Sequence, residues 1–339
     1  SIWVSEILQL LDAVSIKYEI YNEASPNPRD YEVMRGVETY NRENCDLILA
    51  VGGGSSMDCA KGIGIVANNG GHILDYEGVD EVPAPIPPLV CIPTTSGSSA
   101  DVSQFAIIAD VERKVKIAIV SKAVVPDVAL IDPEITTSMS AELTAHTGLD
   151  ALTHAMEALV SNASSPITDL HAMKALELIF ANLLQAIENP EDIVYRTNMS
   201  LGSMHAGLAF SNASLGAAHA MSHSIGGVYD LPHGLCNAVL LPHVIKFNYS
   251  SAAEIYDRIS ALIGLDLDGL SSDGRRDALV EYILDFSHKA EVSQSLASLG
   301  INSDALEGLS RRAMNDACMV TNPVIPEQED IIKVYEEAI

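Results

Sequence analysis

The chain has 339 residues, 48% of them hydrophobic, which suits packed cores in two domains and excludes a disordered chain. With 19 basic and 46 acidic residues its formal net charge is −27, so we expect neither nucleic acid nor an anionic membrane as a partner. No uninterrupted apolar run is long enough to span a bilayer, and the five cysteines are scattered, which fits reduced thiols in the cytoplasm.

The first part of the chain alternates strand and helix patterns. In chain order we expect an amphipathic helix over residues 1–15, a strand over 17–21, a helix over 29–43, a strand over 46–51, a helix over 55–68, a strand over 89–92 and a β-hairpin with strands over 104–108 and 115–120. Parallel strands joined by crossover helices produce this rhythm. The sequence therefore predicts an α/β domain over residues 1–135.

The rhythm changes after Asp132 and Pro133. The expected elements are now helices over residues 141–160, 167–188, 196–212, 215–228, 236–247, 275–288, 305–317 and 329–338. Strand signals almost vanish. The sequence predicts an all-helical domain over residues 136–339.

A glycine-rich turn, Gly52 to Ser56, joins the buried strand 46–51 to the next helix. Glycines let a ligand approach the backbone closely, and the helix N-terminus that follows favours a phosphate. The turn does not match the GxGxxG motif. It does not match a phosphate-binding P-loop either, because Lys61 lies well inside the helix. A plain strand–helix turn is the alternative interpretation.

A second candidate loop, from Pro93 to Ser99, also follows a buried strand directly. Its hydroxyls and amides suit a ribose or a pyrophosphate, whereas its plainer interpretation is a polar surface loop. Ligands of open α/β sheets bind at the carboxyl ends of the strands. Two such loops therefore raise the case for a nucleotide.

Histidines and an aspartate gather in the helical half. Asp150 and His154 stand one helical turn apart, on one face, with Cβ atoms about 5–6 Å apart. His219, His223 and His233 follow in a second block. Each of them is alone more often a structural residue, but together they indicate a metal site with an open position, suited to Fe(II) or Zn(II). The spacing leaves open which histidines bind.

The chain resembles the iron-containing (group III) alcohol dehydrogenases over nearly its whole length. The resemblance is carried by the blocks PNPRDYEV, CDLILAVGGGSSMDCAKGI, CIPTTSGSSADVS, PDVALIDPEIT, HTGLDALTHAMEALVS and GAAHAMSHSIGGVYDLPHGLCNAVLLPHV. It implies a Rossmann-like N-terminal domain, lacking its first strand here, and an all-α metal-binding domain. It also implies hydride transfer between NAD(P)(H) and a small primary alcohol or aldehyde, assisted by a divalent metal.

The resemblance also implies roles for individual residues. The implied metal ligands are Asp150, His154, His219 and His233, with His223 beside them as the proton-transferring residue. The implied cofactor-binding residues are Gly53, Gly54, Ser55, Asp58, Thr94, Thr95, Ser98 and Lys116. Fe(II) is the expected metal, with Zn(II) as the alternative, and NAD(H) the expected cofactor, with NADP(H) as the alternative.

Two departures from the family pattern bear on the cofactor. Ser99 and Ala100 replace a glycine and a serine in the second loop. Family members carry further residues ahead of Ser1, including the strand that ends in the acidic residue selecting NAD over NADP.

The sequence leaves two rival functions open. A metal-dependent hydrolase would use the same cluster with Glu157 as its base, and it leaves the glycine turn unexplained. An inactive, truncated remnant or scaffold is the second rival. We expect a small-molecule substrate and a homo-oligomer, a dimer or larger.

Overall fold

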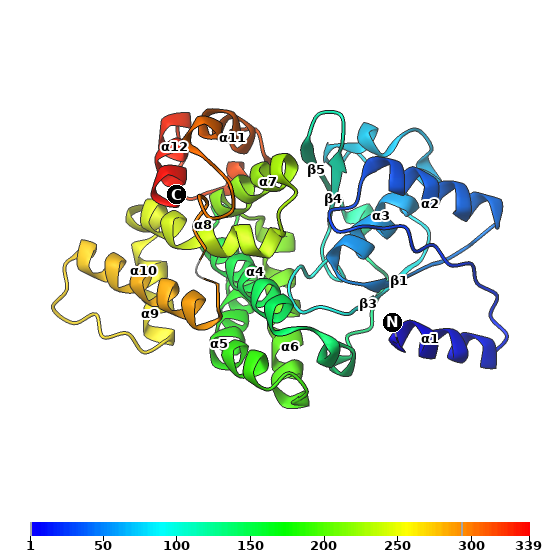
Figure 1. Cartoon of the computed structure of the whole chain (residues 1–339), viewed down its shortest axis with the longest axis horizontal. Helices are drawn as coiled ribbons and strands as arrows, with labels where there is room; N and C mark the ends of the chain where they lie inside the picture. Colours follow the sequence, from blue (N-terminus) through cyan, green and yellow to red (C-terminus); the bar gives the residue numbers. More distant parts are fainter. Residues whose placement is uncertain (1, 293) are drawn as a thin grey trace. The chain divides into compact units, whose positions relative to one another are not determined.

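The computed structural model describes residues 2–292 and 294–339. The chain forms two compact units (Figure 1). One consists of the chain up to Thr94 together with Ala100–Thr136, and the other of Thr95–Ser99 together with Thr137–Ile339. Each unit is described by itself below.

The first unit contains two small sheets. A parallel sheet has the order β1 (Ile48–Gly52), β3 (Leu89–Pro93) and β6 (Val128–Ala129). The second sheet has the order β2 (Gly78–Val79), β5 (Val115–Val120) and β4 (Phe105–Asp110), with β4 and β5 antiparallel. The predicted hairpin and the two predicted buried strands are confirmed.

The helices of this unit are α1 (Ile2–Ala13), α2 (Asp30–Arg42) and α3 (Gly54–Asn69), with short 3₁₀ turns η1 (Ile73–Tyr76) and η2 (Lys122–Val124). Helix α3 is buried on two sides. Its Met57 and Ala60 pack in one apolar cluster with Leu89 of β3. Its Ile63 packs in another cluster with Val33 of α2. This double burial fixes the position of the glycine turn that precedes α3.

The strand predicted over residues 17–21 is wrong. These residues have no regular secondary structure, and the side chains of Tyr18 and Ile20 are exposed. An alternating apolar pattern forms a strand only where a neighbouring strand and a core receive it.

A buried lysine links two elements of the first unit. Lys61 of α3 is fully buried, and its Nζ donates to the carbonyls of Ser103 (2.8 Å) and Phe105 (2.7 Å). Burial lowers the pKa of this ammonium group. Lys61 therefore ties α3 to the start of β4.

Among the described residues, the regular elements of the second unit are all helices. Its α-helices are α4 (Ala141–Val160), α5 (Pro166–Glu188), α6 (Ile193–Ala213), α7 (Ala217–Tyr229), α8 (His233–Asn248), α9 (Ala253–Leu262), α10 (Ser272–Lys289), α11 (Leu306–Met314) and α12 (Gln328–Glu337). Short 3₁₀ turns are η3 (Pro133–Ser138), η4 (Tyr249–Ser251), η5 (Ser303–Ala305) and η6 (Ala317–Thr321). The predicted helices are present, and α9 is an additional one.

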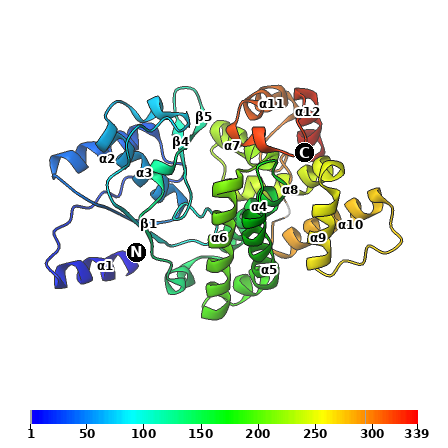
Figure 2. The same ribbon diagram turned by 180° about the vertical axis from the view of Figure 1, so that it is seen from behind.

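Helix α4 is the central element of this unit. It packs against α5, α6 and α8, and every residue from Gly148 to Val160 is buried (Figures 1 and 2). A helix buried on all sides cannot keep a polar side chain unless that side chain finds partners inside. Asp150, His154 and Glu157 of α4 are therefore the informative residues.

Helix α5 has the length and the apolar composition of a membrane span. The core helix of a soluble protein meets the same test, and α5 packs closely against α4 and α6.

Candidate functional site

Three side chains from three helices converge in the second unit. Asp150 lies on α4, His219 on α7, and His233 is the first residue of α8. The Oδ1 atom of Asp150 is 3.8 Å from the Nε2 atom of each histidine. One ligand atom from each residue lies within 4.8 Å of the other two.

A glycine permits this convergence. A Cβ atom on Gly234 would collide with the carbonyl oxygen of His146 and lie 3.2 Å from the Cβ of Asp150. The absence of a side chain there lets the start of α8 rest directly on α4. Helix α8 begins earlier than predicted, at His233 rather than at residue 236.

His219 is held as a neutral imidazole that directs Nε2 into the cluster. Burial lowers the pKa of His219 to about 3. Its Nδ1 lies 2.5 Å from Oε2 of Glu157, which also accepts a hydrogen bond from the Ala218 N–H through Oε1 (2.7 Å). Burial raises the pKa of Glu157 to about 7. The backbone N–H groups that donate to this carboxylate act in the opposite direction. The carboxylate holds the proton of His219 on Nδ1, so the Nε2 lone pair faces the cluster.

His233 is oriented in a similar way. Its Nδ1 lies 3.0 Å from the hydroxyl oxygen of Ser222, one helix away. Its side chain is 26% accessible, whereas that of His219 is 1% accessible. Of the three converging side chains, that of His233 is the most accessible to solvent.

His154 lies directly against this group. Its ring stacks on that of His219, with centroids 4.5 Å apart, and on that of Phe210, with centroids 4.4 Å apart. Burial lowers its pKa to about 4, so the ring is neutral. Its Nδ1 is buried and has no hydrogen-bond partner. His154 is not among the three residues whose ligand atoms lie within 4.8 Å of one another.

His223 belongs to the neighbourhood through its ring. It is stacked on His233, with centroids 5.1 Å apart, and its Nδ1 lies 2.9 Å from Oδ2 of Asp316. Burial acts to raise the pKa of Asp316, but the nearby His223 and the hydrogen bonds from His223 and Cys318 outweigh it and hold that pKa below its usual range. Asp316 thus fixes the orientation of the His223 ring.

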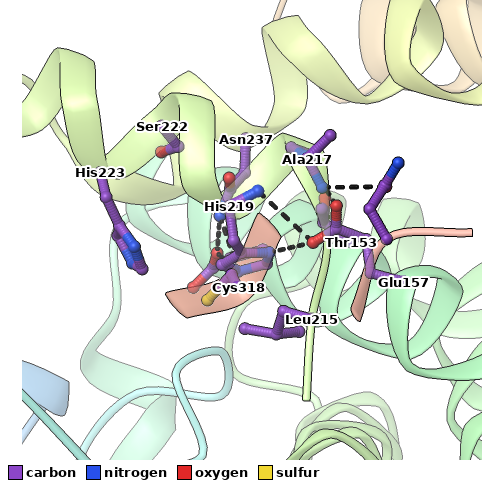
Figure 3. A network of polar contacts seen from close by, with 12 residues as sticks. Thr153, Glu157, Leu215, Ala217, His219, Ser222, His223, Asn237 and Cys318 are labelled. Atoms are coloured by element: carbon purple, nitrogen blue, oxygen red, sulfur yellow. Dashed lines mark hydrogen bonds and ion pairs between the residues drawn. The ribbon is translucent and has the colours of Figure 1, made fainter. Parts of the chain in front are cut away.

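Sequence reasoning missed several residues of this network (Figure 3). Asn237 donates to the cluster, Ser222 orients His233 and Asp316 orients His223. Glu157 was considered only as the base of a hydrolase. Helical spacing carried a signal for two of them, because Asn237 lies four residues after His233 and Glu157 three after His154.

The cluster fits a divalent metal. Two ligand atoms that each lie about 2.0–2.2 Å from one ion are at most about 4.4 Å apart, and both carboxylate-to-imidazole distances satisfy this limit. Buried polar atoms without partners are rare in native proteins. Among the described residues, two of the four such side-chain atoms, His154 Nδ1 and Asn237 Oδ1, lie at this site. A neutral imidazole pair with one carboxylate is also a ligand set that binds Fe(II) or Zn(II).

The glycine turn and the start of the second loop lie side by side in the first unit. Gly52 at the end of β1 pairs with Pro93 at the end of β3, and the Thr94 N–H donates to the Gly52 carbonyl (2.9 Å). A Cβ atom on Gly52 would lie 2.7 Å from the Cβ of Ser56, so the turn requires glycine there. Gly53 is the N-cap of α3, and Gly54 and Ser55 form its first turn.

Lys116 reaches the same turn through one intermediary. Its Nζ donates to Oδ1 of Asn27 (2.7 Å), whose own N–H donates to the hydroxyl of Ser55 (3.2 Å). Asp58 lies in the second turn of α3, whereas the cap of this helix is Gly53. The first unit thus brings together the turn, Thr94 and Lys116.

The rest of the second loop belongs to the helical unit. Thr95 and Ser98 are in the segment Thr95–Ser99. A Cβ atom on Gly97 would lie 2.9 Å from the Cα of Thr147 on α4, and the Ser99 hydroxyl donates to the Ser203 carbonyl of α6 (2.6 Å). This segment is therefore packed tightly against the helices.

An α/β unit with a glycine turn at its strand ends, and a helical unit with a buried carboxylate–imidazole cluster, are the parts of a metal-dependent dehydrogenase. Family profiles agree: "Iron-containing alcohol dehydrogenase" matches residues 1–133 and "Fe-containing alcohol dehydrogenase family, C-terminal" matches residues 144–339. The chain belongs to the iron-containing alcohol dehydrogenase family.

Individual relatives agree with this assignment. The chain is 38% identical to the NAD-dependent methanol dehydrogenase of Bacillus methanolicus, over 98% of this chain and 88% of that protein. It is 38% identical to the 1,3-propanediol dehydrogenase of Klebsiella pneumoniae, over 99% and 87%. A crystal structure of a 1,3-propanediol oxidoreductase superimposes with a TM-score of 0.95 at 38% identity, covering 99% of this chain and 88% of that one.

The family assignment confirms the predicted fold class and the predicted activity. The protein is an oxidoreductase of the iron-type, nicotinamide-dependent alcohol dehydrogenases. Alcohols and aldehydes as substrates are consistent with the activities of its relatives. Nothing in the comparisons supports a hydrolase or a remnant, and Glu157, the base that a hydrolase requires, is engaged by His219 and by the backbone of α7.

Proposed function

We propose that this chain binds one Fe(II) ion through Asp150, His154, His219 and His233 and uses NAD(H) to interconvert a small primary alcohol and its aldehyde. Zn(II) is the alternative metal and NADP(H) the alternative cofactor. The observation that carries the proposal is the convergence of one carboxylate and two imidazoles, whose ligand atoms lie within 4.8 Å of one another in the helical unit.

The helical unit supplies the binding and the orientation of the metal. When bound, the ion supplies Lewis-acid chemistry at the alcohol or aldehyde oxygen. Burial keeps His154 and His219 neutral, which leaves their lone pairs available at neutral pH. Glu157 and Ser222 hold the rings of His219 and His233, so neither imidazole has to reorient when it binds.

The α/β unit supplies the cofactor site. When bound, the nicotinamide supplies the hydride chemistry. In our proposal Gly53, Gly54 and Ser55 hold the pyrophosphate at the start of α3, where amide groups and the helix dipole favour negative charge. Asp58, Thr94, Thr95, Ser98 and Lys116 complete the site.

His223 is proposed to transfer the proton of the reaction. Asp316 accepts the hydrogen bond of its Nδ1, so Nε2 is the nitrogen left to accept or release a proton. Its stacking on His233 puts it beside the cluster without making it one of the three converging residues.

Absorbance of NADH tests the activity directly. The protein, freed of metal with a chelator, is assayed with short aldehydes and with the corresponding alcohols before and after Fe(II) or Zn(II) is restored. We expect turnover only with metal, and His219→Ala and His233→Ala proteins that lose both metal content and turnover. Full metal content in both variants would contradict the ligand assignment.

A His223→Ala protein tests the proton-transfer role. We expect metal content to stay at the wild-type level while turnover falls by about 10²–10⁴-fold, the usual contribution of general acid–base catalysis. Loss of the metal from this variant would make His223 a ligand instead.

We further propose a homo-oligomer in the cytoplasm. Exposed apolar side chains, including Leu170 on α5 and Ile325 before α12, are available for contact between copies. Light scattering of the purified protein measures the oligomeric state, and a monomer at micromolar concentration would contradict it. Fractionation of the source cells measures the location, and recovery with membranes would contradict a cytoplasmic enzyme.

A further inference from the structure

One amide nitrogen lies between all three converging side chains. Asn237 of α8 is fully buried. Its Nδ2 lies 2.7 Å from Oδ1 of Asp150, 3.0 Å from Nε2 of His219 and 3.2 Å from Nε2 of His233. Figure 3 shows Asn237 beside His219. The lone pairs that would bind a cation all point at this single donor group.

The other end of the amide is unsatisfied. Oδ1 of Asn237 is buried and has no hydrogen-bond partner. A buried carbonyl oxygen without a partner lowers the stability of the fold. The alternative amide orientation would turn this oxygen toward the Asp150 carboxylate and two acceptor nitrogens, where it would be repelled. The contacts therefore assign the NH₂ group, not the oxygen, to the cluster.

The neighbouring contacts make the donation specific. His219 directs its Nδ1 proton to Glu157, and His233 has Ser222 at its Nδ1, so both rings present Nε2 as an acceptor. With no donor between them, two acceptor nitrogens and a carboxylate oxygen would face one another in a buried space. The rings would then turn away, and that movement removes a lone pair from the site.

We propose that Asn237 is a positioning residue that holds Asp150, His219 and His233 at ligand spacing before the metal binds. Its NH₂ group shares two hydrogens among the three lone pairs before the metal binds, and it yields these lone pairs to the ion. The inference rests on the metal site of the proposed function, since it concerns the same three side chains.

The test compares metal affinities of full-length variants. Asn237→Leu keeps the shape of the side chain and removes its hydrogen bonds. Asn182→Leu makes the same change at a buried asparagine of α5 that bonds within α5 and to α6, away from the cluster. Zn(II) affinity is measured by competition with a chromophoric chelator, and the visible spectrum of the Co(II) form reports ligand geometry. We expect a 10–100-fold weaker affinity and an altered Co(II) spectrum for Asn237→Leu only.

A second variant keeps the test informative if the leucine protein does not fold. Asn237→Asp changes one atom and places a carboxylate 2.7 Å from the Asp150 oxygen, where the amide now donates. We expect its metal-free form to unfold at a lower temperature than wild type and the stabilisation by added Zn(II) to be larger, since the cation relieves the repulsion. Wild-type affinity for Asn237→Leu, or an unchanged metal-induced shift for Asn237→Asp, would overturn the proposal.

His219→Ala in the same assay separates this inference from the proposed function. If His219→Ala loses the metal while Asn237→Leu binds it as tightly as wild type, only the role of Asn237 is wrong. If His219→Ala and wild type bind equally, the metal site itself is wrong, and the inference fails with it.

Discussion

The carboxylate–imidazole cluster, to which we assign the metal, and the glycine turn, to which we assign the cofactor pyrophosphate, would bind a charged group in opposite ways. The cluster uses side chains, and its two imidazole rings are each oriented by a second residue, as His219 is by Glu157. The turn uses the backbone, and its requirement is the absence of side chains, as at Gly52. We therefore expect the cluster to respond to changes in charge and proton position, and the turn to respond to added volume.

The first prediction concerns charge in the cluster. Burial lowers the folded-state pKa of His154 to about 4, below the ordinary value of about 6.5. The unfolded chain therefore binds the extra proton first, so the stability that neutral His154 contributes is complete above pH 6.5 and is lost as pH falls toward 4. The loss is on the order of 3 kcal/mol.

Thermal unfolding of metal-free protein between pH 7.5 and 4.5 measures this effect. A His154→Gln protein should lose stability less steeply with acid than wild type. The raised pKa of Glu157 acts in the opposite direction and is common to both proteins, so it largely cancels in the comparison. Parallel curves for the two proteins would show that His154 is not held neutral by burial.

The second prediction concerns proton position. Glu157→Gln keeps the size of the side chain but replaces an acceptor oxygen with an NH₂ group near Nδ1 of His219. We expect the His219 proton to move to Nε2 in part of the molecules and the metal affinity to fall about 10–100-fold. Metal competition measures the affinity, and ¹⁵N NMR of the metal-free protein reports the tautomer. An unchanged tautomer with unchanged affinity would contradict the role of Glu157.

The third prediction adds volume to the turn. Gly54→Val places a branched side chain at the first position of α3, where the pyrophosphate would lie. We expect NAD(H) binding at least about tenfold weaker, because the amide groups there become obstructed. Calorimetry measures the cofactor affinity and elemental analysis the metal, which should remain at the wild-type level. Equal cofactor affinity would remove the turn from the site.

The smallest expected effect is at Lys116. This residue is half-buried and reaches the turn through Asn27, so we expect its contribution to match that of an exposed polar contact. Lys116→Ala should raise the KM for NADH by about twofold to fivefold, the size of an exposed ionic contact, with kcat unchanged. A change confined to kcat would contradict a role in binding the cofactor.

The same contrast explains what the sequence could predict. Periodicity located the buried strands and most of the helices, because apolar spacing reports burial directly. The family resemblance identified Asp150, His219 and His233 together, and the structure brings them together. The strand over residues 17–21 failed because alternation alone does not supply a pairing neighbour.

The sequence did not predict which side chains on different helices contact one another. The link from Glu157 to His219 spans 62 positions, and that from His223 to Asp316 spans 93. Asn237 looks like an ordinary polar residue in the string HGLCNAV until α8 is seen to rest on α4 at Gly234. Such contacts depend on how helices pack, and no local pattern records that.

Anomalous diffraction at the metal absorption edge, from active crystals loaded with Fe(II) or Zn(II), tests the central claim most directly. We predict one peak per chain, about 2.0–2.2 Å from Oδ1 of Asp150 and from Nε2 of His219 and His233, with a nitrogen of His154 as the fourth ligand. Active crystals with no peak there, or with the peak at another group of residues, would contradict the claim that this cluster is the metal centre of the enzyme.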